Sequence, residues 1–360
     1  MTRAIGVISG TSMDGIDVAW LDGDGETIAE VGPGAAYPYP PQVAARLREV
    51  IADPAQAAGP LEALERDVTD AHVAAVETFL AERAIARDSV ALVGLHGQTV
   101  LHRPQARFTR QLCDGARAAA RLGIDVVCDF RSADVAAGGE GAPLVPLYHA
   151  AIAAGLERPL MFLNWGGVGN VTYLGRAGEI VAFDTGPANA LLDDFLRRRL
   201  GLSHDEGGAL AAKGRTRDDL VAQWMQDPYF ARPAPKSLDR NHFHALTAGT
   251  EALSDADGAA TLAAFTVEAT AAALAQVPEA PRRWLVCGGG RRNATLMATL
   301  ARRLGVTVAP IEAIGQEGDF VEAACFAHLA LRSRRGLPLS LPSTTRVPTP
   351  MPGGVYWPKS

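Results

Sequence analysis

Cysteine is scarce, and its few copies are not spaced for metal binding. The chain has 360 residues and four cysteines, which are dispersed at Cys113, Cys128, Cys287 and Cys325. No Cys-x-x-Cys pair supports a structural zinc site, and four scattered thiols do not make a disulfide framework. We therefore expect each cysteine to be a small core residue.

Clustered positive charge and long apolar runs are also missing. The net charge is -6, and no stretch forms a basic stripe, so we expect no nucleic-acid partner. The Ala-rich stretch 256–277 contains Asp257 and Glu268, which favours a packed helix over a membrane span. No signal peptide is visible before the first apolar strand. We expect a cytoplasmic protein without a membrane partner.

The overall composition is that of a globular protein large enough for two domains. Hydrophobic residues make up 48% of the chain and charged residues 21%, and this length favours two domains. A glycine-rich break, Gly138–Pro143, is the candidate boundary. We expect an N-terminal domain over 1–136, with the tail 345–360 packing back on it, and a C-terminal domain over 137–344.

The opening of the chain predicts a hairpin with a polar turn. Apolar residues precede and follow the turn 10–17, and the second run alternates with a period of two. The turn carries two glycines, two hydroxyls and two carboxylates. Glycines and hydroxyls suit phosphate oxygens, and a carboxylate suits Mg²⁺. No lysine follows as in a Walker motif. A polar turn without chemistry is the alternative.

Three more glycine-bearing turns follow predicted strands. The second half repeats the pattern of strand, glycine turn and strand around 164–170, and similar turns stand at 184–189 and 288–293. Ligands in α/β sheets bind at strand ends. The set predicts phosphates held by two hairpin turns and a nucleoside at the Gly288–Asn293 corner. Trp165, inside the second turn, packs on a ligand or simply fills the hinge.

Several polar side chains close predicted strands or begin helices, and each has two interpretations. Asp184 is either a general base or the N-cap of the next helix. His96 is an acid, a base or a structural hydrogen bonder. Arg131 and Asp134 bind a ligand or form a surface ion pair. Glu322 binds a ligand or complements a helix dipole.

Taken together, these segments resemble the anhydro-N-acetylmuramic acid kinases over nearly the whole chain. The opening signature is Gly10-Thr11-Ser12-Met13-Asp14-Gly15-Ile16-Asp17. Further similar segments are GLHGQT (94–99), the DFR to LVP stretch (129–146), FDTGPAN (183–189), CGGG to Asn (287–293), Glu-Ala to Leu-Ala (322–330) and the closing 341–354. Where that family usually has Asn-Ile-Gly-Gly-Ile-Ala-Asn, this chain has Asn-Trp-Gly-Gly-Val-Gly-Asn at 164–170. The segment 315–321 also differs from the amino-acid sequence usual in that family.

The resemblance implies a two-domain α/β protein with the actin/hexokinase-like fold, two RNase-H-like halves, and ATP and sugar in the cleft. It implies that water opens the 1,6-anhydro ring of anhydro-N-acetylmuramic acid while O6 takes the γ-phosphoryl of ATP. The products would be N-acetylmuramic acid 6-phosphate and ADP, in peptidoglycan recycling. A homodimer is the family expectation.

The resemblance also assigns roles to residues. Asp184 would take the proton of the attacking water, and Mg²⁺ would lie near Asp14. The expected sugar-binding residues are His96, Gln98, Arg131, Asp134 and Glu322, with Arg131 suited to the lactyl carboxylate. The expected ATP-binding residues are Gly10, Thr11, Ser12, Met13, Asp14, Gly15, Ile16, Asp17, Asn164, Gly166, Gly167, Gly169, Asn170, Gly288, Gly289, Gly290 and Asn293.

Three other functions stay open from the residues alone. The first is a kinase of the same fold that phosphorylates an ordinary sugar hydroxyl, with Asp184 deprotonating that hydroxyl. The second is a non-catalytic ATP-binding module, which would bind nucleotide without sugar turnover. The third is a glycoside hydrolase that does not use ATP.

Overall fold

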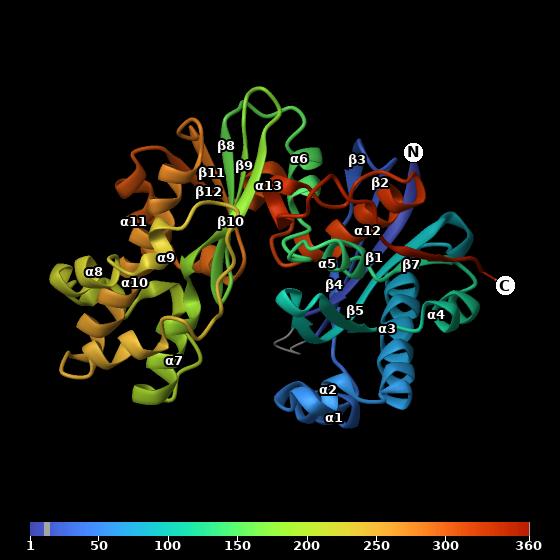
Figure 1. Cartoon of the computed structure of the whole chain (residues 1–360), viewed down its shortest axis with the longest axis horizontal. Helices are drawn as coiled ribbons and strands as arrows, with labels where there is room; N and C mark the ends of the chain where they lie inside the picture. Colours follow the sequence, from blue (N-terminus) through green and yellow to red (C-terminus); the bar gives the residue numbers. More distant parts are fainter. Residues whose placement is uncertain (11–14, 360) are drawn as a thin grey trace. The chain divides into compact units, whose positions relative to one another are not determined.

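The computed structural model describes residues 1–10 and 15–359, which form two compact units. Unit 1 comprises residues 1–154 and 320–360, and unit 2 comprises residues 155–319. Each unit contains one sheet with helices packed beside it (Figure 1). The sequence predicts that the N-terminal domain ends at residue 136 and that the chain returns to it at residue 345. In the structure, residues 137–154 and 320–344 also belong to unit 1.

The sheet of unit 1 has the strand order β13-β7-β5-β1-β2-β3. β1 pairs antiparallel with β2 and parallel with β5, which in turn pairs parallel with β7. Two strands lie off this path, since β4 pairs with β2 and β6 with β5. The strands are β1 (Thr2–Ser9), β2 (Ile16–Gly23), β3 (Ile28–Val31), β4 (Ala35–Tyr37), β5 (Leu92–Arg103), β6 (Phe108–Leu112), β7 (Asp125–Cys128) and β13 (Val355–Trp357).

Helices contribute apolar side chains to the core of unit 1. Leu47 of α1 and Phe79 of α3 belong to the same buried cluster as Ile5 and Val7 of β1. The helix α12 packs on β1, β2 and β5. The helices of unit 1 are α1 (Pro41–Ala52), α2 (Pro54–Ala58), α3 (Glu62–Glu82), α4 (Gly115–Leu122), α5 (Ser132–Ala136), α6 (Pro146–Ile152), α12 (Val321–Arg334) and α13 (Pro342–Thr345).

Glycines in two strands allow α12 to approach the sheet closely. A Cβ atom added to Gly6 of β1 would lie 1.8 Å from the Ala323 carbonyl oxygen. One added to Gly94 of β5 would lie 2.1 Å from the Phe326 carbonyl oxygen. Both distances are far inside van der Waals contact, so any larger residue would displace α12. These two glycines therefore determine how closely α12, which has Glu322 in its first turn, approaches the sheet.

Unit 2 repeats the topology of unit 1. Its sheet has the order β10-β9-β8-β11-β12, with the first three strands antiparallel and β8, β11 and β12 parallel. The order β3-β2-β1-β5-β7 in unit 1 corresponds to β10-β9-β8-β11-β12 in unit 2. When β4 and β6, which lie off the path, are left out of the count, both sheets have the strand order 3-2-1-4-5 of the RNase-H-like fold. The duplication confirms the predicted actin/hexokinase-like fold. The strands are β8 (Leu160–Trp165), β9 (Val168–Leu174), β10 (Ile180–Pro187), β11 (Arg283–Cys287) and β12 (Thr307–Pro310).

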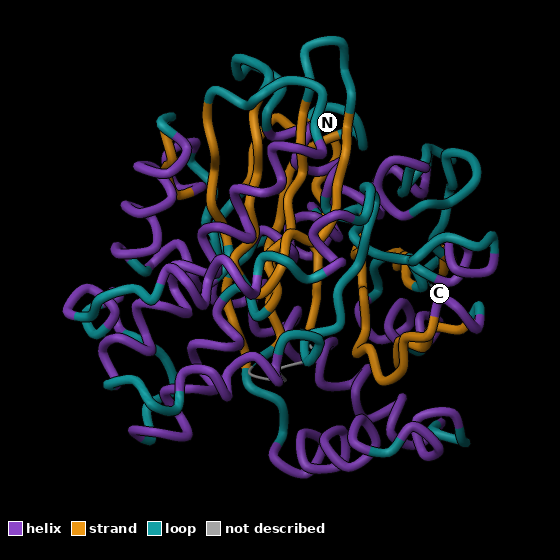
Figure 2. Tube along the Cα trace, turned by 60° about the vertical axis from the view of Figure 1, so that its left-hand side comes forward, coloured by secondary structure: helices purple, strands orange, loops and turns teal. Residues whose placement is uncertain are grey.

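Figure 2 shows helices (purple) flanking the strands (orange). The helices of unit 2 are α7 (Asn189–Leu200), α8 (Asp218–Trp224), α9 (Pro228–Ala231), α10 (Asp255–Ala271) and α11 (Ala294–Leu304). Among these, α10 contacts β10, α11 contacts β12 and α7 contacts β9. Within the described residues, the stretch Asp255–Gln276 is the one helix long and apolar enough to cross a membrane by length and composition. Of its most apolar window, 72% is buried inside the protein, as in a core helix.

Several elements differ from those that the sequence pattern predicts. β5 does not end at His96 but continues to Arg103, and β6 was not predicted. Asp184 lies inside β10 rather than at its end, and the strand continues to Pro187. The N-cap of α7 is Ala188, so the capping interpretation of Asp184 is wrong.

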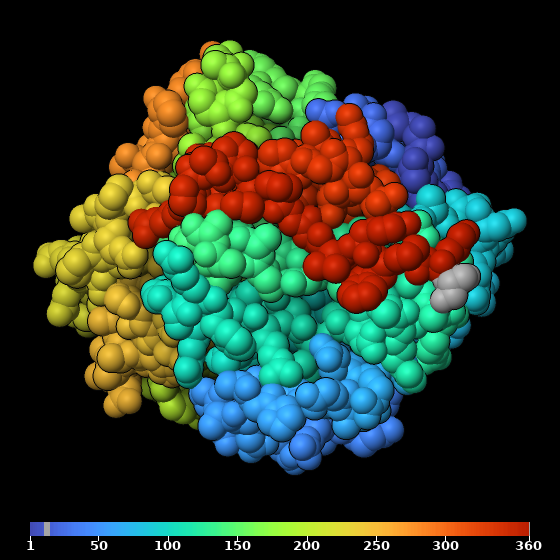
Figure 3. Space-filling view, turned by 45° about the vertical axis from the view of Figure 1, so that its right-hand side comes forward, coloured from blue at the N-terminus to red at the C-terminus, as the bar shows by residue number. Residues whose placement is uncertain are grey.

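The C-terminal tail packs on unit 1. β13 pairs antiparallel with β7, and the Tyr356 hydroxyl donates to Asp125 over 2.6 Å. The Glu140 amide donates to the Thr345 carbonyl, which ties the tail to the glycine-rich break. In Figure 3 the tail (red) lies on the surface beside the teal and green segments of unit 1.

Candidate functional site

Polar residues from three motifs lie in one row across the sheet of unit 2. Asn164 of β8 pairs with Asn170 of β9, and Asn170 pairs with Asp184 of β10. On the other side, Asn164 pairs with Cys287, the last residue of β11. The two-residue turn Gly166-Gly167 joins β8 to β9 beside this row. The register therefore places Asp184 next to the second glycine turn.

A segment far along the chain holds Asp184 by both its main chain and its carboxylate. The Leu238 amide donates to Asp184 Oδ2 over 2.8 Å, and the Asp184 amide donates to the Lys236 carbonyl over 2.8 Å. The Tyr229 hydroxyl donates to the Asp184 carbonyl over 2.5 Å. Lys236 is itself buried, and burial lowers its pKa to about 8. The carboxylate is half-buried and fixed in orientation.

Trp165 is a core residue. Its side chain is fully buried, and its indole N–H donates to Thr270 Oγ1 over 3.0 Å. Its carbonyl oxygen accepts from Asn189 Nδ2 over 2.8 Å. The structure therefore supports the interpretation in which the Trp165 ring fills space inside the protein rather than packing on a ligand.

The Gly288–Asn293 corner joins β11 to α11. Gly288 has a φ of +72°, and a Cβ there would lie 2.3 Å from Asn164 Oδ1, so only glycine fits. Asn293 is the N-cap of α11, because its Oδ1 accepts from the Leu296 amide over 3.0 Å. Arg291 donates to the Gly288 carbonyl and forms ion pairs with Glu312 and Asp319. The corner is therefore rigidly held.

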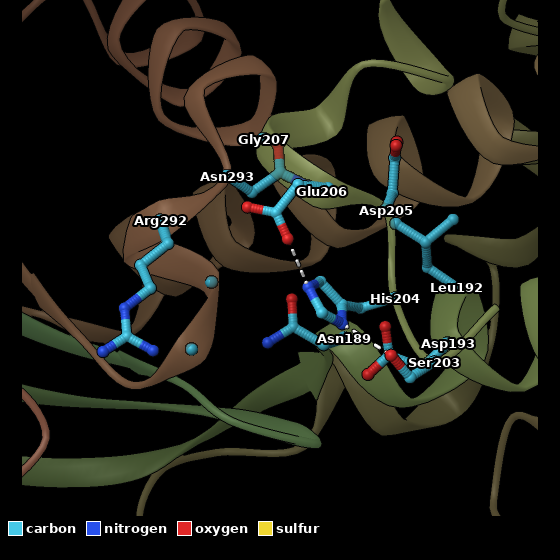
Figure 4. A pocket seen from close by; sticks show the side chains of 12 residues that line it. Asn189, Leu192, Asp193, Ser203, His204, Asp205, Glu206, Gly207, Arg292 and Asn293 are labelled. Carbon is cyan, nitrogen blue, oxygen red and sulfur yellow. Dashed lines mark hydrogen bonds and ion pairs between the residues drawn. The ribbon is translucent and has the colours of Figure 1, made fainter.

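A cavity of about 600 Å³ opens at this corner (Figure 4). Ligand sites typically occupy roughly 300–1,000 Å³, so the cavity has the size of a nucleoside site. Burial raises the pKa of Asp193 to about 6. The lining residues are Asn189, Leu192, Asp193, Ser203, His204, Asp205, Glu206, Gly207, Gly289, Gly290, Arg292 and Asn293.

Sequence analysis missed the loop that closes this cavity. His204 lies between Ser203 Oγ and Glu206 Oε2, at 2.9 and 2.8 Å from its two ring nitrogens (Figure 4). The Asp205 carboxylate accepts from the amides of Leu210 and Ala211, which fixes the loop. The run of polar residues ending in Gly207 and Gly208 was the available signal. The segment 229–238 that holds Asp184 had no such signal.

The first glycine turn is only partly described. Thr11, Ser12, Met13 and Asp14 lie outside the described residues. Gly10 is half-buried after β1, and Gly15 is buried before β2. Ile16 belongs to the buried core, so its side chain packs inward rather than contacting a ligand. Asp17 is half-buried in β2, where it pairs with Ile8.

Three of the expected sugar-binding residues come together in unit 1. Arg131 Nε donates to His96 Nε2 over 3.0 Å, and Arg131 Nη1 donates to the Gly141 carbonyl over 2.7 Å. His96 is buried, and its ring lies 4.6 Å from that of Phe326 in α12. Burial and the nearby Arg131 charge lower the pKa of His96 well below its usual value. His96 is therefore a neutral acceptor that orients Arg131.

Glu322 is electrostatically coupled to this pair. Its side chain is accessible to solvent at the start of α12, yet dense packing around it raises its pKa. The positive charge of Arg131 acts in the opposite direction. An arginine held by a neutral histidine beside a carboxylate can bind a substrate carboxylate and hydroxyl groups.

Gln98 and Asp134 do not join this group. Gln98 is fully buried, and its Nε2 donates to the carbonyls of Gly10 and Thr99. The Asp134 carboxylate is 2% exposed and accepts from the Gly141 amide and the hydroxyls of Ser340 and Thr345. Both side chains therefore hold backbone segments, and their expected contact with the sugar stays a prediction.

A protein cage for a metal ion is absent from residues 1–10 and 15–359, where no three or more His, Cys, Asp or Glu side chains are arranged to hold one. Mg²⁺ usually keeps several waters and binds through one or two carboxylates plus substrate phosphates. Asp14, the carboxylate expected to bind such an ion, lies outside the described residues.

The sequence comparisons agree with one another. The family model described as anhydro-N-acetylmuramic acid kinase matches residues 2–359. An anhydro-N-acetylmuramic acid kinase of Rhodospirillum rubrum is 51% identical over 99% of this chain and 94% of its own. One of Paramagnetospirillum magneticum is 50% identical over 98% of both chains.

Similarity among solved structures is weaker. The (R)-2-hydroxyglutaryl-CoA dehydratase component A of Acidaminococcus fermentans aligns over 93% of this chain and 100% of its own, with 10% identity and a TM-score of 0.49. Family assignment rests on the sequence matches, which extend over both units and include the row of Asp184 and the Gly288 corner. The chain belongs to the anhydro-N-acetylmuramic acid kinase family.

Proposed function

We propose that this protein is an ATP-dependent kinase of 1,6-anhydro-N-acetylmuramic acid, which it converts to N-acetylmuramic acid 6-phosphate while ATP becomes ADP. The observation that carries this proposal is the family match over both units, combined with Asp184 beside the Asn164–Asn170 turn. The reaction would serve the recycling of peptidoglycan.

The two glycine turns and the corner are proposed to bind ATP. Phosphoryl transfer depends mainly on positioning and charge neutralisation, which backbone amides in glycine turns can supply. The corner cavity would take the adenosine, since Gly289, Gly290 and Asn293 line it. The proposed phosphate-binding residues are Gly10 to Gly15, Asp17, Asn164, Gly166, Gly167, Gly169 and Asn170. Mg²⁺ would be held by Asp14 and the phosphates and would neutralise their charge.

Asp184 is the proposed general base. It takes a proton from water as the water oxygen bonds to C1 of the sugar. The bond between C1 and O6 breaks, and O6 forms a bond to the γ-phosphorus as ADP leaves. The hydrogen bond from the Leu238 amide to Oδ2 holds the carboxylate in a fixed orientation toward the water.

Arg131, His96 and Glu322, which we call the Arg131 group, are proposed to bind the sugar. Arg131 carries a permanent positive charge suited to the lactyl carboxylate, and His96 fixes its orientation. Glu322 accepts hydrogen bonds from sugar hydroxyl or amide groups. Gln98 and Asp134 act indirectly, through the backbone segments that they hold.

A comparison of acceptors tests the proposed function. ADP release is measured with ATP and the anhydro sugar, with ATP and reducing N-acetylmuramic acid, and with ATP alone. We expect release only with the anhydro sugar. Release with the reducing sugar at a similar rate would indicate an ordinary hydroxyl kinase. Nucleotide binding without release in any mixture would indicate a non-catalytic module, and sugar hydrolysis without ATP a glycoside hydrolase.

A further inference from the structure

Four buried polar side chains meet directly behind the start of the first glycine turn. Ser9 ends β1, Tyr39 follows β4, His72 lies on α3 and Gln98 lies on β5. Their exposed fractions are 1%, 7%, 0% and 0%. We call this set the Tyr39 network. Bringing four polar groups from four elements into a core requires that each be hydrogen-bonded.

Tyr39 is the centre of the network. Its hydroxyl lies 2.7 Å from Ser9 Oγ, 2.9 Å from His72 Nε2 and 3.3 Å from Gln98 Oε1. Ser9 Oγ also lies 3.1 Å from His72 Nε2 and 3.4 Å from the Gly97 carbonyl oxygen. One hydroxyl thus connects three neighbouring elements to the last residue of β1.

The hydrogen atoms have one arrangement that satisfies the chain of donors. Burial lowers the pKa of His72 to about 3, so the ring is neutral and carries one N–H. His72 Nδ1 has no hydrogen-bond partner within the described residues. Placing the proton on Nε2 avoids an unpaired buried N–H. His72 then donates to Tyr39, the Tyr39 hydroxyl shares its proton between Ser9 Oγ and Gln98 Oε1, and Ser9 donates to the Gly97 carbonyl.

The network reaches the turn itself through Gln98. Its Nε2 donates to the Gly10 carbonyl over 3.3 Å, while its Oε1 faces the Tyr39 hydroxyl. The pairing of β1 with β5 shifts between Val7 and Ser9, so that Ser9 stands opposite Gln98. Gly97, with a φ of +76°, provides this bulge. A peptide group is planar, so fixing the Gly10 carbonyl fixes the plane of the peptide that opens the turn.

We propose that Tyr39, His72 and Gln98 are positioning residues that hold the start of the first glycine turn in the geometry needed for phosphate binding. This inference rests on the proposed function, because it needs the turn to bind ATP phosphates. None of the three touches substrate in this account. They act through Ser9 and Gly10, and holding these two residues in place before ATP arrives lowers the entropy cost of binding.

The test compares Tyr39→Phe with Thr69→Val. Tyr39→Phe removes the central hydroxyl and keeps the ring. Thr69 is an equally buried hydroxyl on α3, but it bonds to the Glu65 carbonyl and the Asp114 amide, away from the turn. We expect Tyr39→Phe to lower kcat/KM for ATP about 10- to 100-fold, with KM for the sugar changed less than about twofold. Thr69→Val lowers the melting temperature and leaves both constants near wild type.

A second pair keeps the inference testable if Tyr39→Phe does not fold. His72→Gln retains an N–H donor toward Tyr39, whereas His72→Leu removes it. We expect glutamine to retain most of kcat/KM for ATP and leucine to lose it. An unchanged kcat/KM for ATP in folded Tyr39→Phe or His72→Leu would overturn the inference, as would equal losses in both His72 variants. If wild type shows no sugar-dependent ADP release, the proposed function fails instead.

Discussion

Asp184 is restrained more tightly than a surface carboxylate. Its amide, its carbonyl and one carboxylate oxygen each have a hydrogen-bond partner on the segment 229–238. A general base must be held within reach of the proton that it takes, and these contacts supply that restraint. The same contacts explain why Asp184 sits inside a strand instead of capping a helix.

Asp184→Asn therefore tests the role of this carboxylate. Asparagine has nearly the same shape, and its amide oxygen can still accept from the Leu238 amide, so we expect a folded protein. It cannot take a proton from water, and turnover should fall by about 10²-fold or more. Steady-state ADP release measures turnover, and titration with a fluorescent ATP analogue checks that nucleotide binding is retained. Near-normal turnover would remove Asp184 from the mechanism.

His96 and Gln98 show what could be predicted for single residues. Both belong to the GLHGQT motif, and regular strand alternation would give residues two apart the same face. The bulge at Gly97 breaks this alternation, so that His96 contacts Arg131 while Gln98 contacts Gly10. The motif and its spacing singled out this segment, but they did not indicate the backbone shift that gives the two side chains different partners.

The helix α12 links the sheet of unit 1 to the Arg131 group. Its backbone lies against Gly6 and Gly94, and its Phe326 ring lies beside His96. Glu322 stands in its first turn. If α12 moved away from the sheet, Phe326 and Glu322, which both lie near Arg131, would therefore move together.

Gly94→Ala should disturb this packing. The new Cβ would lie 2.1 Å from the Phe326 carbonyl oxygen, so α12 must shift. We expect a loss of about 1–3 kcal/mol in the free energy of unfolding, together with a raised KM for the sugar. Urea denaturation and steady-state kinetics measure the two effects. Gly155→Ala is the control, because nothing lies within 4 Å of a Cβ there. Equal stability of the two variants would contradict the packing argument.

Most elements with strong patterns were predictable. The opening hairpin and the helix in the Ala-rich stretch 256–277 occur where the pattern placed them, because alternation and composition are local properties. β6 has no such pattern, since four of its five residues are exposed or half-buried. Its existence depends on pairing with an extended β5, which is a tertiary effect.

At the scale of the whole molecule, the repeated strand order explains why two of the four glycine turns, 10–17 and 164–170, stand at matching places in the two units. Each unit begins with a hairpin whose turn binds ligands in the proposal. The unit boundaries were less predictable than the repeat. Residues 320–344 follow unit 2 in the chain, yet α12 covers β1 and β5 because distant glycines admit it. No local feature near residue 320 carries that information.

Buried histidines predict a loss of stability on acidification. Burial lowers the pKa of His72, His149 and His328 to about 3, and that of His96 well below its usual value. Below about pH 6.5 the unfolded chain binds protons that the folded protein does not, so stability is full above that pH and falls below it. The raised pKa of two carboxylates, Asp193 and Glu322, acts in the opposite direction.

The four histidines outnumber the two carboxylates, so we expect the free energy of unfolding to fall as the pH falls below about 6.5. The midpoint of urea unfolding should therefore be lower at pH 5.5 than at pH 7.5. His328→Leu should reduce this difference, because both ring nitrogens lack hydrogen-bond partners among the described residues. His244→Gln, at an exposed position, is the control. An equal or higher midpoint at pH 5.5 would contradict this prediction.

The central claim is that one reaction both hydrolyses the anhydro bond and phosphorylates O6. The most direct measurement is ADP release with the anhydro sugar in ¹⁸O-labelled water, followed by mass analysis of the sugar product. The account predicts one ¹⁸O on the C1 hydroxyl and an unlabelled phosphate on O6. Absence of sugar-dependent ADP release, or ¹⁸O found in the phosphate rather than on C1, would contradict it.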